Sequence, residues 1–258
     1  MSSVEAVRFT LYCPFPVSFR YPVASTYGRT YQFPTPTVLK GLIENACGFP
    51  PDALPFADSV DIALIAHSTD TLAFEALEKV RIFSQNSFAS VKDQPHRVDF
   101  GHLGGGTYIR QFLPPGQQYT VYLRNRHPFY PTNTLAERIQ RPFRAPFLGQ
   151  SDTLVAIEEI EVVSLQHTQS EEVDSWVAVT EDTLPIDLKQ VRGRVPLRFN
   201  RLIEEERKRF SRVDVLLAVG LGEPVRLRRA VACFRDGDRH LCFVGTNEKG
   251  PIHEPYVP

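Results

Sequence analysis

A helix with both of its ends marked is the feature that most constrains the fold of this chain. Thr35 fits the N-cap position, Pro36 the first helical position, and Gly48 the residue after the last turn. The apolar residues between them recur at helical spacing: Val38, Leu39, Leu42, Ile43 and Ala46. A strand-like alternation over residues 4–12 precedes this helix, and an apolar run over residues 60–66 follows it. We therefore expect the order strand–helix–strand at the N-terminus.

A long hairpin excursion is expected next, over residues 81–124. Residues 80–83 lead out, and residues 119–123 return with the alternation of a strand. The tip between them is polar, basic and rich in glycine, with Gly101, Gly104, Gly105 and Gly106.

The rest of the chain contains further strands and two short helical patterns. A helix capped by Thr132 or Thr134 is expected at 132–140, and a strand at 154–164 whose glutamates 158, 159 and 161 face solvent. The later segments are predicted as an acidic loop at 167–190, a charged helix at 200–210, and strands at 213–219, 225–233 and 239–244. This mixture predicts an α+β fold with a modified ferredoxin-like or RRM-like core.

The charge of the chain is distributed in blocks. The net charge is −1, which excludes only an indiscriminately cationic binder. Residues 81–149 carry nine Arg or Lys against three Asp or Glu, whereas residues 150–191 carry one against ten. Such blocks indicate separate faces for different partners. The acidic block would repel RNA and suits a protein partner or solvent.

Several classes of protein lack support in the sequence. No apolar run approaches the roughly 20 residues of a membrane span, and no secretory signal pattern is present, so a cytoplasmic protein is expected. The four cysteines show no CxxC spacing and the seven histidines no metal-ligand spacing, so neither a metal nor a cofactor is predicted. The segment LGGGT at residues 103–107 lacks the Gly-Lys-Ser/Thr of a phosphate loop.

The basic segment interleaves cations with aromatic residues. The cations are Arg81, Lys92, Arg97, Arg110, Arg124 and Arg126, and the aromatics Phe83, Phe88, Phe100, Tyr108, Phe112, Tyr119 and Tyr122. Single-stranded RNA is bound by this combination, through phosphate contacts and base stacking. The alternative is a surface hairpin whose aromatics cover the core, and composition alone leaves both interpretations open.

Three segments, in order, resemble the CRISPR-associated protein 5 family of type I Cascade complexes. They are FRYPVASTYGRTYQFPTPTVLKGLIENACG (19–48), YIRQFLPPGQQYTVYL (108–123) and RPFRAPFLGQSDTLVAIEEIEV (141–162). The first and third are fairly specific in combination. The resemblance covers about the first 165 residues, and the last 90 add nothing to it.

The resemblance implies an RRM-like RNA-binding core over residues 1–165, with a thumb-like β-hairpin at about 81–123, and a variable β-rich extension over 166–258. It implies a non-catalytic subunit that holds the 5′ handle of the CRISPR RNA (crRNA). Its protein partners would be the last backbone subunit and the large PAM-reading subunit, with target DNA contacted only indirectly. The expected RNA-binding residues are Arg20, Arg29, Tyr31, Thr37, Lys40, Arg97, His102, Tyr108, Arg110, Arg144, Gln150 and Ser151.

Two other functions stay open at this point. In one subtype of the family this subunit cleaves precursor crRNA without a metal, at a Tyr/Lys/His-type site. The nearest match here is Arg126–His127 together with Tyr31, and arginine is a poor proton donor because its pKa lies above about 12. An unrelated small-molecule enzyme is the other alternative, and the sequence contains no catalytic signature for it.

Overall fold

The computed structural model describes most of the chain. The described residues are 3–20, 27–28, 30–50, 59–67, 74–81, 105–127, 130–149, 153–180, 183, 185–187, 193–196, 199–204, 207–212, 216–220 and 223–245. Within this part the fold is α+β, with two helices and a six-stranded antiparallel sheet. Neither of these helices is long and apolar enough to cross a membrane.

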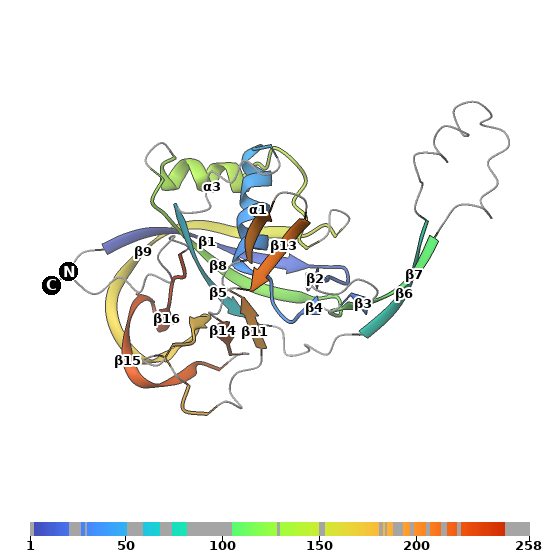
Figure 1. Ribbon diagram of the computed structural model, residues 1–258. Coiled ribbons are helices and arrows are strands. Elements are labelled where there is room, and N and C mark those ends of the chain that lie inside the picture. The colour runs from blue at the N-terminus through green and yellow to red at the C-terminus, as the bar shows by residue number, and fades with distance from the viewer. Residues whose placement is uncertain are drawn as a thin grey trace.

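The large sheet is built from strands far apart in sequence. Its order is β16-β15-β9-β1-β8-β5. The strands are β1 (Ser3–Cys13), β5 (Val60–Ala66), β8 (Gln117–Asn125), β9 (Ala156–Val173), β15 (Val225–Asp236) and β16 (Arg239–Leu241). Helices α1 (Pro36–Cys47) and α3 (Thr132–Gln140) lie on the same side of this sheet in Figure 1. The elements β1, α1, β5, β8, α3 and β9 thus follow the order β-α-β-β-α-β.

Helix α1 has the ends expected from the sequence. Thr35 Oγ1 accepts a hydrogen bond from the Val38 N–H at 3.3 Å, and Gly48 adopts φ +83°, a conformation that favours glycine. Helix α3 has no side-chain cap, because Pro131 occupies the N-cap position. The predicted caps at Thr132 and Thr134 are therefore wrong.

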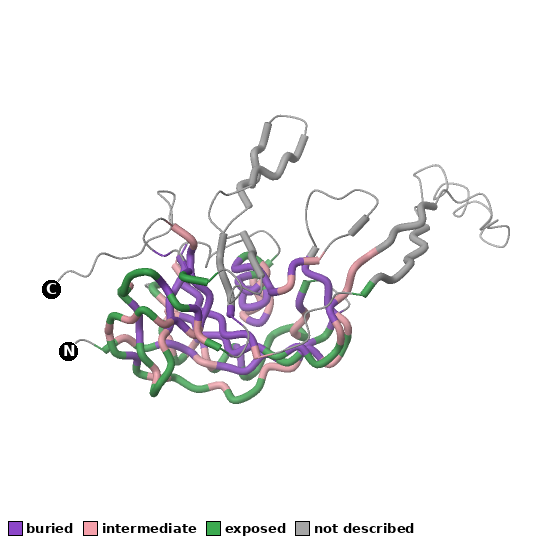
Figure 2. The backbone as a smooth tube through the Cα atoms, turned by 90° about the horizontal axis from the view of Figure 1, so that it is seen from below, coloured by how far each residue is buried: buried purple, intermediate pink, exposed green. Residues whose placement is uncertain are grey.

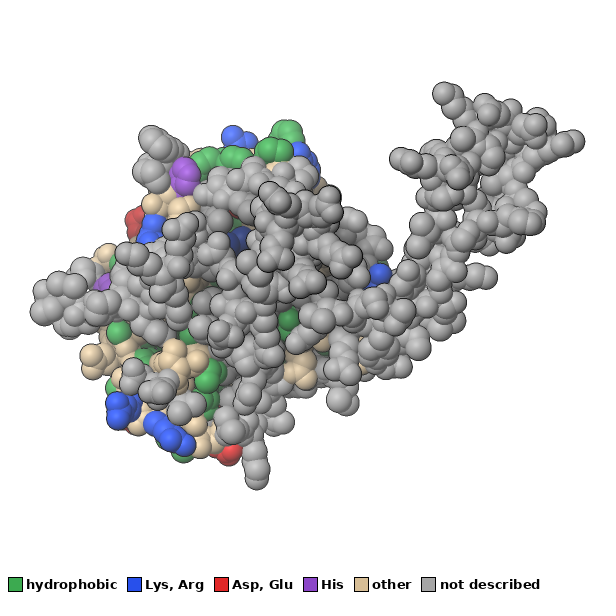
Figure 3. Space-filling view, viewed as in Figure 1, with side chains coloured by type: hydrophobic (Ala, Val, Ile, Leu, Met, Phe, Trp, Pro, Cys, Tyr) green, Lys and Arg blue, Asp and Glu red, His purple; other side chains and the backbone are tan. Residues whose placement is uncertain are grey.

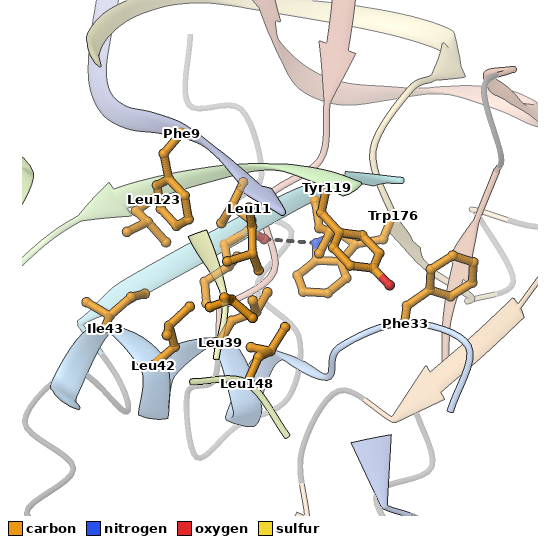
Figure 4. Close-up of a cluster of buried hydrophobic side chains, with 14 of the residues drawn as sticks. Phe9, Leu11, Phe33, Leu39, Leu42, Ile43, Tyr119, Leu123, Leu148 and Trp176 are labelled. Carbon is orange, nitrogen blue, oxygen red and sulfur yellow. Dashed lines mark hydrogen bonds between the residues drawn. The ribbon is translucent and has the colours of Figure 1, made fainter. Parts of the chain in front are cut away.

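The main core lies between α1 and the sheet. Leu39, Leu42 and Ile43 of α1 belong to one buried cluster with residues of β1 and β8 (Figure 4). The buried residues fill the centre of the body in Figure 2. The alternation predicted over residues 4–12 is confirmed, since Val7, Phe9 and Leu11 all join this cluster.

The β5 edge of the sheet is covered by two later segments. Val244 forms a bridge with Ile62, and the Trp176 N–H donates to the Leu64 carbonyl at 2.9 Å. The Trp176 indole donates to the Ile62 carbonyl at 2.9 Å (Figure 4). Strand β16 forms the opposite edge of the sheet and ends three residues before Val244. The bridge between Val244 and β5 therefore brings the two edges of the sheet together.

A separate hairpin extends from the body (Figure 1). Its strands are β6 (Phe74–Arg81) and β7 (Gly105–Phe112), and β3 (Tyr27–Gly28) pairs in parallel with β7. The returning strand is therefore β7, and the expected return at residues 119–123 is wrong. Those residues form β8 of the central sheet, where Tyr119 and Tyr122 are fully buried. Gly105 and Gly106, assigned to the tip, lie in β7, and the expected tip residues Gly101 and Gly104 lie outside the described residues.

The C-terminal part is richer in strands than expected. The helix predicted at 200–210 is the hairpin β12 (Phe199–Glu204) and β13 (Arg207–Arg212), whose register sets Glu204 opposite Arg207. A short charged segment of this kind does not distinguish a helix from a hairpin by its periodicity alone. The acidic loop predicted from residue 167 is also wrong at its start, because β9 continues to Val173 and pairs with β15.

The remaining strands are short. They are β2 (Phe19–Arg20), β4 (Thr30–Tyr31), β10 (Val177–Ala178), β11 (Gly193–Pro196) and β14 (Leu216–Val219). The division at residue 165 stays a prediction, and that residue lies inside β9, which pairs with both β1 and β15.

Candidate nucleic-acid interface

The aromatic residues on the sheet face opposite the helices are covered. RRM domains stack bases on exposed aromatic residues of this face. Here Phe234, Leu241 and Phe243 pack over it in a second buried cluster that includes Tyr122 and Ala63. The aromatic Tyr122 is fully buried, and burial raises its pKa. RNA would therefore need another surface of this molecule.

The N-terminus of α1 offers a free amide. Pro36 has no N–H, and the amides of Val38 and Leu39 both donate to Thr35. Thr37 is exposed, and within the described part of the chain its N–H finds no acceptor. A phosphate oxygen at this end of the helix would be favoured by that amide and by the helix dipole.

The segment 141–149 runs along α1 from its last turn toward its first half. At the C-terminal end, Phe143 N–H donates to the Ala46 carbonyl at 2.8 Å. Arg144 Nη1 donates to the Phe49 carbonyl at 2.9 Å, where a cation also suits the helix dipole. Further along, Leu148 lies beside Leu39 in Figure 4.

An exposed basic and aromatic surface results at the end of α1 and α3. We call it the arginine–phenylalanine patch, and it consists of Arg138, Arg141, Phe143 and Arg144. Phe143 is 67% exposed, and the Arg144 guanidinium lies 5.6 Å from its ring centroid. At the top of Figure 3, over α1 and α3, arginine and hydrophobic side chains lie next to one another. This combination can bind phosphate and stack on a base.

Three residues of this patch were missed by the sequence analysis, which selected Arg144 alone. The signal was present in the segment RPFRAPFLG at 141–149, where two arginines flank a phenylalanine. Arg138 carried no such signal, because its exposure depends on the orientation of α3.

The structure separates the predicted site residues. Thr37 and Arg144 lie near opposite ends of α1, which at about 1.5 Å per residue is about 18 Å long. Tyr31 and Lys40 are buried, so their side chains offer little surface to RNA in this chain.

The other predicted residues lie on or near the strands at the hairpin base. Arg110 of β7 lies over the Phe112 ring at 5.9 Å, Tyr108 pairs with Glu78, and Arg20 pairs with Thr30. The remaining predictions fall outside the described residues: Arg29, Arg97, His102, Gln150 and Ser151.

Two cations of the basic segment belong to the body and not to the hairpin. Arg124 donates to Asp61 Oδ2 through Nε at 2.9 Å and Nη2 at 2.6 Å, and Arg126 donates to Oδ1 at 2.8 Å. Asp61 is 2% exposed. The Arg124 guanidinium also lies over the rings of Phe234 and Phe243. These contacts tie β8 to β5 and to the C-terminal segment.

The residues considered for RNA cleavage lie at opposite ends of β8. Tyr31 pairs with Phe19, close to the bridge between Val17 and Leu113 that precedes β8. His127 lies two residues beyond the end of β8, and this strand of nine residues is about 30 Å long. Among the described residues, no cluster of three or more His, Cys, Asp or Glu side chains could hold a metal ion.

Comparison with known proteins identifies the family. Residues 7–209 match the family model described as "CRISPR-associated protein (Cas_Cas5)". The chain belongs to the CRISPR-associated Cas5 family. This match includes α1, the β6–β7 hairpin and the arginine–phenylalanine patch, and it confirms the family resemblance seen in the sequence.

Solved structures with a similar fold include two CRISPR proteins. One is described as "Crystal structure of a CRISPR protein from Archaeoglobus fulgidus", with 12% identity, TM-score 0.47, and coverage of 95% of this chain and 100% of that chain. The other, from a "CRISPR RNA-guided surveillance complex", has 13% identity, TM-score 0.46, and coverage of 86% and 90%. No curated protein matches the sequence. Neither structural likeness extends what the family match shows.

Proposed function

We propose that this Cas5 family member is a non-catalytic crRNA-binding subunit of a type I CRISPR effector complex, where it holds the 5′ handle of the guide RNA. The observation that carries the proposal is the family match over residues 7–209. The core would be ferredoxin-like, which the order β-α-β-β-α-β supports, and the β6–β7 hairpin would be its thumb.

The RNA would contact the helix side of the molecule. The covered sheet face supports this choice, because its aromatic residues are buried under β15 and β16. The N-terminus of α1 would bind a phosphate, and the arginine–phenylalanine patch would add a stacking contact. Gln150 and Ser151, which were predicted to bind RNA, follow Gly149 in the sequence. Gly149 lies against the backbone of Ser18, the residue that directly precedes β2.

A binding role is further supported by the positions of the residues considered for cleavage. Tyr31 is buried and lies the length of β8 away from His127. General acid–base catalysis needs both groups within hydrogen-bond reach of one substrate. We therefore propose that the chain binds crRNA without cutting it.

The partners would be the backbone subunit next to the handle and the large PAM-reading subunit. Target DNA would be reached indirectly, since guide pairing reads its sequence. The complex would act in the cytoplasm of a prokaryotic cell.

Titration of the purified chain with a labelled repeat-derived RNA tests the function directly. Handle-selective binding that weakens with salt, with the RNA intact after long incubation, is expected. Cleavage at one position without added metal would overturn the non-catalytic role. Equal affinity for the handle and for a scrambled RNA would overturn handle recognition.

The phosphate contact at α1 is tested with a variant that does not weaken the fold. Thr37→Glu places an acid in the first turn and should stabilise the helix by about 0.3–1 kcal/mol, while repelling phosphate. Asn133→Glu makes the same change at the second residue of α3. We expect RNA affinity to fall at least fivefold for Thr37→Glu and to change little for Asn133→Glu. Equal losses would exclude a local contact.

The arginine–phenylalanine patch is tested in the same titration. Arg144→Ala should weaken binding severalfold and reduce the salt slope by about one. Arg226→Ala is the matched control, because Arg226 is an exposed arginine on β15 that forms an ion pair with Glu172.

A further inference from the structure

A polar cavity of about 790 Å³ lies on the sheet face opposite the helices. It is lined by residues of β1, β8, β9 and the β15–β16 turn, together with His67 after β5. Four carboxylates and two guanidiniums line it. Desolvation, with a smaller contribution from Arg239, lowers the pKa of His67, so its ring adds no charge at neutral pH. The lining is therefore negative overall.

Two of the carboxylates share one arginine as their counter-ion. Arg8 Nη1 lies 2.7 Å from Asp236 Oδ2, and Arg8 Nη2 lies 2.6 Å from Glu161 Oε2. The Tyr122 hydroxyl also donates to Asp236 at 2.9 Å. Arg8 is thereby held between two acids and is poorly placed to receive a phosphate.

Glu159 is different from its neighbours. Its Oε2 accepts a hydrogen bond from the Thr10 hydroxyl at 2.8 Å, and within the described part of the chain it forms no ion pair. Thr10 itself is 7% exposed. Glu159 is exposed, and a carboxylate that forms no ion pair among the described residues is a suitable partner for a cation from outside the chain.

The backbone holds Glu159 in this position at a cost. The β1–β9 register shifts between Arg8 and Thr10, so that Glu161 pairs with Arg8 and Glu158 with Thr10. Glu159 lies in this bulge with φ +52°, the left-handed region that favours glycine. Bulges of this kind redirect a side chain, and here Glu159 lines the cavity beside Thr10.

We propose that this cavity is a docking site for an arginine or lysine side chain of a partner protein, with Glu159 as its counter-ion. The volume is large enough for several residues of a peptide. RNA is excluded as the occupant by the negative lining, and no metal-ligand cluster occurs among the described residues. This surface is separate from the RNA contacts on the helix side, and it does not depend on handle binding.

The test uses the full chain and a fluorescein-labelled hexa-arginine peptide, followed by anisotropy at physiological salt. Glu159→Gln should weaken binding at least tenfold. Glu158→Gln removes the same charge one residue away, outside the cavity lining, and should change the affinity less than twofold. Equal affinities for both variants, or no saturable binding to the native chain, would overturn the proposal.

A second variant separates binding from folding. Glu159→Gly removes the carboxylate and also relieves the positive φ, so the melting temperature should stay equal or rise while peptide affinity falls. Retained affinity in Glu159→Gly would contradict the assignment. Handle RNA affinity should be unchanged in every variant, so a failure here is distinguishable from a failure of the RNA-binding role.

Discussion

Gly149 packs directly against the backbone of Ser18. A Cβ atom added to Gly149 would lie 2.4 Å from the Ser18 carbonyl oxygen, and its φ of +77° is itself unfavourable for other residues. A glycine in such a place can serve a close approach to RNA or a simple turn. Packing of the 141–149 segment onto the start of β2 is a third role, and it requires glycine without any ligand.

Gly149→Ala is expected to reduce the free energy of unfolding by about 2–4 kcal/mol, because positive φ and a backbone clash act together. Gly116→Ala is the matched control: its φ is +87°, but nothing lies within 4 Å of an added Cβ. It should cost about 1 kcal/mol. Urea unfolding measures both, and similar costs at the two sites would contradict the close contact.

Asp61→Asn should destabilise the protein by about 3–5 kcal/mol, because it leaves Arg124 poorly solvated and without its counter-ion. Glu172→Gln breaks the ion pair with Arg226. The side chain of Glu172 is 47% exposed and that of Arg226 is 63% exposed. That change should cost less than about 1 kcal/mol. Chemical denaturation of both variants gives the comparison, and a small effect at Asp61 would show that the network is dispensable.

Trp176→Phe removes the indole donor to the Ile62 carbonyl from a fully buried site. We expect a loss of about 0.5–1.5 kcal/mol for this hydrogen bond, because the carbonyl keeps its bond from the Val244 N–H, with a further cost for the smaller ring. Circular dichroism must follow this unfolding, because Trp176 is the only tryptophan of the chain. An unchanged midpoint would mean that the β5 edge is held without this bond.

Stability should fall as the pH rises above about 9. Burial raises the pKa of Cys13 to about 12 and those of Cys47 and Cys233 to about 11 from 9.0. The unfolded chain therefore loses these protons first, so the stabilisation is present below pH 9 and is lost between pH 9 and 12. Thermal melts across this range test the expectation. Replacing Cys13 with alanine should flatten the dependence, and an unaltered slope would assign it to other groups.

The elements with local signals were predicted well from the sequence. Helix α1 carries its own N-cap and C-terminal glycine, and β1 alternates because one of its faces packs on that helix. Residues 119–123 were recognised as a strand but were given the wrong partner. Alternation along a strand indicates that one face is buried, but it does not identify the strands that pair with it. Tyr119 pairs with Leu11 and Ala66 and not with the hairpin.

The candidate site was harder to predict, because its residues meet only through tertiary packing. Arg144 was selected, but its place at the far end of α1 from Thr37 follows from hydrogen bonds that the sequence does not encode locally. The acidic sequence around Glu159 likewise gives no indication of the β-bulge.

The β6–β7 hairpin is inserted in the sequence between β5 and β8, two strands that pair with each other. The chain leaves the sheet at His67, whose N–H donates to the Gln118 carbonyl at 3.0 Å, where the chain has returned. Ala66 and Tyr119 are paired across the same gap. Loop closure depends only weakly on length when the two ends already meet. Insertions, deletions or exchange of this arm should therefore leave the folding of the body intact, so that its reach can evolve independently of the core.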